Sequence, residues 1–171
     1  MQFLSSAAAR KWTEERGYEI NDSFGHPVPQ YTQADVRFKI PLDAGARVAL
    51  ARMLWESITE GSPEVLLWIT DYGVWPSGEH RPLAESARRG LGARSALQDT
   101  PGHLIHLGED DGGLTIVCLA ILFLWDCWIL PSAGSKAAYL SHDEYGIVYG
   151  RRGDEAFLRR LDAFKVERIE A

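Results

Sequence analysis

An unbroken apolar run at 65–69 is the clearest strand signal in the chain. The run follows Pro63 and ends before Asp71 and Gly73. A continuous apolar run of this length is typical of a strand that is covered on both faces, so we expect an interior strand here. The next residues, up to His80, mix aromatic, proline, glycine and charged side chains, which predicts a loop at the carboxyl end of that strand.

The pattern before this strand predicts a second strand and a long helix. Residues 35–42 alternate apolar and polar positions, as a half-buried strand does. Asp43 is placed to cap a helix that runs through Glu60 with an apolar stripe, and Gly61 closes it. If the two strands are parallel, this order is that of a right-handed crossover unit.

Three more helices are expected from capping residues and periodicity. They cover 7–16 after Ser5 or Ser6, 83–90 after Pro82, and 154–169. Arg88, Arg89 and Arg94 lie at or beyond the end of the second of these, where arginines satisfy a helix dipole. Residues 18–33 hold two prolines and no periodicity, so an irregular loop is predicted.

Residues 114–130 form the most apolar segment. Its unbroken part is about ten residues long, short of the roughly 20 that cross a bilayer, so a buried helix is expected, then a strand at Cys127. Residues 128–131 and 137–140 predict a hairpin. Ser141 and Glu144 match a capping box, which predicts that another helix begins there.

Together these elements predict one domain over 1–171. Its class is α/β or α+β, with a mixed sheet of about four or five strands packed by helices. The net charge of −6 and pI near 5.4 argue against nucleic acid or an anionic membrane as partner and favour a basic protein. The sequence lacks the pattern of a secretory signal, so a cytoplasmic protein is expected, with Cys118 and Cys127 reduced and buried.

The chain carries none of the strong catalytic motifs, and we expect neither a cofactor nor a bound metal. His103 and His106 form an HxxH pair, which has little specificity for metal. His142 beside Asp143 resembles a general acid/base pair, but the capping box is the better interpretation of the same residues. Asp126 sits in an apolar run, where we expect it to bond backbone amides; a carboxylic acid of raised pKa in a pocket is the alternative.

The loop after the first strand is the expected interaction surface. Aromatic anchors with a charged rim are typical of protein interfaces. The alternative is that its two aromatic residues fold back over the end of the sheet. The expected partner-binding residues are Asp71, Tyr72, Trp75, Glu79, His80, Asp110 and Asp111. Trp75 is the expected anchor, and Asp110 and Asp111 are expected to lie near the loop.

Four sequence blocks, WITDYGVWPSGEH, PGHL, WDCWILP and SHDEY, are similar to those of a set of small uncharacterised bacterial proteins. The resemblance covers roughly residues 35–150 and implies a bacterial origin, but it transfers no catalytic residue. Small acidic bacterial proteins without catalytic motifs are often immunity proteins, so the leading hypothesis is an inhibitor of a basic toxin domain. The alternative is a small hydrolase or metal-dependent enzyme; a structural subunit is a third option. The enzyme would draw on Asp71, Glu79, His103, His106, His142 and Asp143.

Overall fold

The computed structural model describes residues 1–21, 26–28, 34–72, 80–133, 136–150 and 155–164. Among them, seven strands form one sheet in which every neighbouring pair is antiparallel. In spatial order these strands are β1 (Gln2–Leu4), β6 (Gly102–His106), β5 (Glu64–Asp71), β7 (Asp126–Pro131), β8 (Ala137–Ser141), β9 (Tyr145–Tyr149) and β4 (Ala34–Lys39). The class is therefore α+β.

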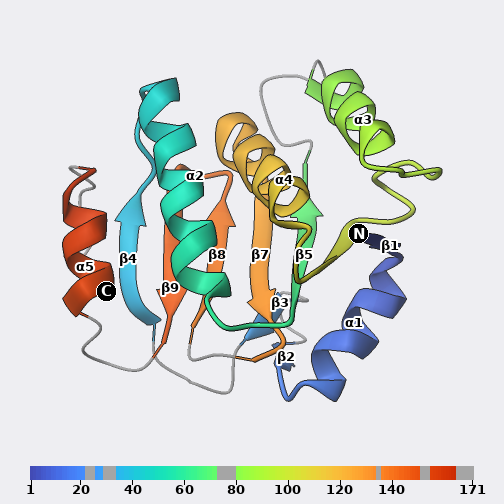
Figure 1. The fold of residues 1–171 in the computed structure, drawn as a ribbon, viewed down its shortest axis with the longest axis horizontal. Helices are drawn as coiled ribbons and strands as arrows, with labels where there is room; N and C mark the ends of the chain where they lie inside the picture. The colour runs from blue at the N-terminus through green and yellow to red at the C-terminus, as the bar shows by residue number, and fades with distance from the viewer. Residues whose placement is uncertain (22–25, 29–33, 73–79, 134–135, 151–154, 165–171) are drawn as a thin grey trace.

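This architecture corrects the expected mixed sheet of four or five strands. β4 and β5 point the same way, but β9, β8 and β7 lie between them, so no parallel crossover pair forms (Figure 1). A separate two-stranded pair, β2 (Glu19–Asn21) with β3 (His26–Val28), lies within the segment that was expected to be irregular. The missed strands are short, and short strands give little periodicity to recognise.

The helices of the described chain begin largely where capping residues predict. They are α1 (Ser6–Glu15), α2 (Ala44–Thr59), α3 (Arg81–Gly90), α4 (Asp110–Phe123) and α5 (Glu155–Asp162). Ser5 Oγ accepts from the amide of Ala8 at 3.3 Å, and Asp43 Oδ1 accepts from the amide of Ala46 at 2.7 Å. Both contacts satisfy amides of a first helical turn, which confirms these two starts.

Alternate residues along the strands belong to two apolar clusters, one on each face of the sheet. Val65, Leu67 and Ile69 of β5 belong to the larger cluster, which also contains buried residues of α2, α4 and α5. Leu66 and Trp68 belong to the smaller cluster, together with Ala9 and Trp12 of α1. β5 is thus buried on both faces between β6 and β7, which confirms the expected interior strand. Figure 1 shows α2 and α4 lying across the face of the larger cluster.

A glycine in α4 allows α2 and α4 to approach closely. A Cβ atom at Gly113 would lie 2.2 Å from the ring of Trp55 on α2, far inside van der Waals contact. The helix-weakening glycine is therefore explained by packing. α4 is 14 residues long, and none of the described helices is long and apolar enough to cross a membrane.

The expected helix at Ser141 is wrong, because these residues form the turn between β8 and β9. Ser141 Oγ accepts from the amide of Asp143 at 3.2 Å, and Glu144 adopts a left-handed φ of 63°. A serine followed by acidic residues suits a tight turn as well as a helix start. Because β9 pairs with both β8 and β4, these residues form a turn and not the start of a helix.

Candidate functional site

The two ends of the predicted interaction loop are attached to the body of the protein. Asp71 and Tyr72 lie at the carboxyl end of β5, and the guanidinium of Arg81 sits 5.3 Å from the centroid of the Tyr72 ring. The ring of His80 stacks on Phe123 at the end of α4, with centroids 4.2 Å apart. Trp75 and Glu79 lie outside the described residues, so the role of Trp75 as anchor stays a prediction.

Asp110 and Asp111 lie at the opposite end of the sheet from this loop. Asp110 accepts a hydrogen bond from the indole of Trp55 at 3.3 Å and lines a cavity with Val65, near the start of β5. Asp71 lies at the other end of that strand, roughly 20 Å from Val65 at the usual rise per residue. The structure therefore does not bring the two predicted acidic groups together.

A buried carboxylate organises the sheet end that carries Asp71. Asp126, the first residue of β7, is 6% exposed and lies opposite Asp71 in the strand register. Its Oδ1 accepts from the backbone amide of His142 at 2.8 Å and lies 2.8 Å from the Nδ1 of the same residue. The amide contact confirms the expected structural role of Asp126, which fixes the β8–β9 turn against β7.

The carboxylates around His142 favour its charged form. Burial works against that form, but the hydrogen bond and charge of Asp126, with the charges of Asp143 and Asp71, raise the pKa of His142 overall. Burial and the charge of Asp126 likewise raise the pKa of Tyr139, which keeps its hydroxyl protonated. Two carboxylates thus contact one imidazole, and a third, Asp71, lies opposite Asp126 on the neighbouring strand.

The same geometry makes His142 a poor general base. Its Nδ1 contacts Asp126, and its Nε2 lies 3.5 Å from a carboxylate oxygen of Asp143. Both nitrogens thus face acceptors, an arrangement that suits a doubly protonated ring without a lone pair to offer. Ser141, the adjacent hydroxyl, accepts from the amide of Asp143 instead of contacting a ring nitrogen.

The other two histidines of the proposed enzyme site lie elsewhere. His103 is completely buried, and its Nε2 accepts from Nε of Arg88 at 3.0 Å. His106 is partly exposed, with its Nδ1 3.5 Å from Glu64. His103, His106 and His142 therefore do not converge. In the part of the chain that the structure describes, no three histidine, cysteine or acidic side chains are grouped as metal ligands would be.

Arg88 was expected to satisfy a helix dipole and is instead the centre of a buried polar cluster. It is 1% exposed, and its remaining N–H groups donate to the backbone oxygen of Ser95, to both oxygens of Thr100 and to Glu85. A guanidinium has five such donors, and here each has an acceptor. The sequence did not predict this burial, because Arg88 and Arg89 are adjacent residues of the same type and only the first of them is buried.

Burial and the charge of Arg88 together lower the pKa of His103 to about 3. The ring is therefore neutral and carries its proton on Nδ1, since Nε2 accepts from Arg88. The Nδ1 side faces the backbone oxygens of Leu67 and Pro101, at a geometry short of a full hydrogen bond. These contacts join α3 to the sheet and assign His103 a structural role.

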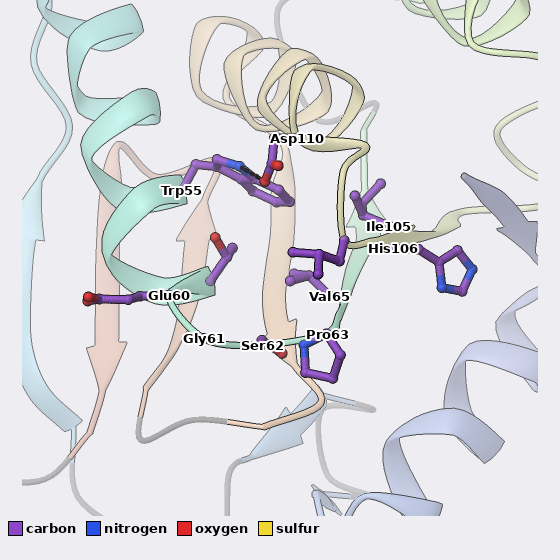
Figure 2. Close-up of a pocket in the computed structure, with 11 residues that line it drawn as sticks. Trp55, Glu60, Gly61, Ser62, Pro63, Val65, Ile105, His106 and Asp110 are labelled. Atoms are coloured by element: carbon purple, nitrogen blue, oxygen red, sulfur yellow. Dashed lines mark hydrogen bonds between the residues drawn. The ribbon is translucent and has the colours of Figure 1, made fainter.

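A cavity of about 380 Å³ opens between the end of α2, the start of β5 and the start of α4. Figure 2 shows its walls, with Trp55 above, Val65 below, and the side chains of Glu60 and His106 directed away from the interior. Asp110 reaches the edge of the cavity, where it bonds Trp55. Its walls are largely apolar, so the cavity offers packing surface rather than reactive groups.

No protein-family model matches the chain, and no curated protein or solved structure matches it either. The similarity to small bacterial proteins and the origin it implies therefore stay predictions.

Proposed function

We propose that this protein binds a basic protein through its acidic sheet end, defined as Asp71, Tyr72, Asp126, His142 and Asp143. The proposed biological role is that of an immunity protein, which inhibits a toxin domain by occupying its cationic active surface. The observation that carries the proposal is that Asp126 and Asp143 both contact His142, with Asp71 opposite Asp126 on the end of the adjacent strand.

The acidic sheet end is suited to binding because its charges are held in place. Asp126 anchors the turn through the amide and ring of His142, so the position of Asp143 is set before a partner arrives. Asp143 itself is 69% exposed, which leaves its carboxylate accessible. A pre-ordered charged surface loses little conformational entropy on association.

Charge also favours this class of partner. The chain carries a net charge of −6, which speeds encounter with a cationic protein at low ionic strength. Tyr72, next to Asp71, packs part of its ring against the larger apolar cluster and leaves part of it exposed, so some apolar contact area lies beside the charge. Many nuclease and other toxin domains that act on anionic substrates are expected to present a matching positive surface.

The test uses the product of the gene adjacent to the one that encodes this chain, where that product is a toxin domain. Binding is measured by surface plasmon resonance for the parent protein and for Asp143→Lys. We expect a lower association rate and at least a tenfold weaker affinity for the variant, because a like charge then faces the cationic partner.

Glu14→Lys is the matched control, since Glu14 is exposed on α1 and the substitution changes the net charge by the same amount. The control is expected to bind within about threefold of the parent, as general charge effects are small when they are distant and screened. Equal losses in the two variants, or full binding by Asp143→Lys, would show that the interface lies elsewhere.

A further inference from the structure

A groove lined by arginines runs between α3 and the segment that follows it. The groove has a volume of about 870 Å³, and its lining includes Arg81 and Arg89 of α3 and Arg94 of the following segment. Arg81 and Arg89 are eight residues apart, which places them on one face of the helix about two turns from each other. Three guanidinium groups therefore border a single concavity.

Buried contacts fix the two walls of this groove. Arg88 donates to the backbone oxygen of Ser95 at 3.2 Å, and Glu85 accepts from the amide of Leu97 at 2.7 Å. The amide of Ala93 also donates to the backbone oxygen of Arg88 at 2.9 Å. Because these contacts tie the segment to the helix, the groove is present without a ligand.

The charge of the groove is not neutralised from within. Among the described residues that line it, Glu85 is the one carboxylate, and its two oxygens accept from Leu97 and Arg88. Among the described residues, no carboxylate pairs with Arg89 or Arg94. A region of positive charge thus remains on a chain whose net charge is −6.

We propose that the arginine groove binds a small phosphate-bearing molecule, whose phosphate oxygens are contacted by Arg81, Arg89 and Arg94. Guanidinium groups form paired hydrogen bonds with phosphate oxygens, and several of them together match the dense charge of a diphosphate better than that of a single carboxylate. The groove touches the acidic sheet end only where Arg81 lies against the ring of Tyr72, and the variants tested below change neither residue, so failure of this proposal would leave the proposed function untouched.

Isothermal titration calorimetry with inorganic pyrophosphate tests the proposal at low ionic strength. The parent protein is expected to bind one equivalent saturably, and the double variant Arg89→Gln/Arg94→Gln at least tenfold more weakly. Arg52→Gln/Arg159→Gln removes the same charge from exposed positions on α2 and α5 and is expected to bind within twofold of the parent. Thermal melts of both variants confirm folding.

The absence of saturable binding by the parent at millimolar pyrophosphate would overturn the proposal, and so would equal losses in the two double variants. Titration with ATP distinguishes the source of the phosphate: tighter binding than pyrophosphate assigns a nucleotide, and equal binding assigns the phosphate group alone. Tighter binding of hexaglutamate than of pyrophosphate would assign the groove to an acidic peptide and contradict the proposal.

Discussion

His103 and His142 each contact a buried charged side chain, and the two environments have opposite effects on the pKa of the ring. His103 is buried against the cation of Arg88, so its pKa falls to about 3 and the ring stays neutral. His142 is partly exposed against the anion of Asp126, and its pKa rises. The same residue type therefore serves as an acceptor inside the protein and as a charged donor at its edge.

The difference separates a structural cluster from a candidate binding site. Around Arg88 every N–H donor of the guanidinium has an acceptor, and Arg88 and His103 are both buried. Around His142 the carboxylates outnumber the imidazole, and Asp143 projects into solvent. A buried guanidinium whose donors are all satisfied helps to fix a fold, whereas a charge exposed at a surface remains available to a partner.

Substitution of Arg88 should have the largest effect on stability. Arg88→Met leaves Glu85, His103 and two backbone oxygens without their donor, which we expect to lower the free energy of unfolding by about 3–5 kcal/mol. Urea denaturation measures this loss. Arg89→Met, at the exposed neighbouring position, should change it by less than about 0.5 kcal/mol. A loss below about 1 kcal/mol for Arg88→Met would contradict the central position of Arg88.

Removal of the Asp126 carboxylate should cost less. Asp126→Ala leaves the amide of His142 without its acceptor, for an expected loss of about 1–3 kcal/mol in the free energy of unfolding. Asp143→Ala is the control, because that side chain is 69% exposed and should contribute less than about 0.5 kcal/mol. If the two variants were equally stable in denaturant, Asp126 would not anchor the turn.

The pH dependence of stability should reveal the smallest effect. Because the folded pKa of His142 lies above its unfolded value near 6.5, its stabilising contribution is complete below pH 6.5 and is lost as pH rises through the folded pKa. The difference in unfolding free energy between the parent and His142→Gln should therefore shrink as pH rises through that range. A difference that grows with pH would reverse the assigned sign.

The sequence predicted correctly those elements that are specified by residues close to one another in the chain. The apolar run of β5, the capping serine of α1 and Asp43 at the start of α2 each specify an element through neighbouring residues. β9 was missed because Ser141 and Glu144 suit a turn and a helix start equally, and the strands that decide between them are distant in sequence.

The candidate site was predicted only in part for the same reason. Asp71 and Tyr72 were predicted to bind a partner from the composition of the loop, and Asp126 was predicted from its apolar surroundings to bond backbone amides. The pairing of Asp126 with His142 depends on the register of three strands, and the burial of Arg88 depends on how α3 packs on β6. Neither contact leaves a pattern in one short stretch of sequence.

An NMR titration of the histidine side chains tests the contrast between the two clusters most directly. Between pH 4 and pH 9, His142 should titrate with a pKa above 6.5, and Asp126→Asn should lower that pKa. His103 should remain neutral, with its Nε2 unprotonated, across the same range. Protonation of His103 near pH 6, or a pKa for His142 at or below 6.5, would contradict the assignment of one cluster as a buried structural anchor and the other as a charged surface.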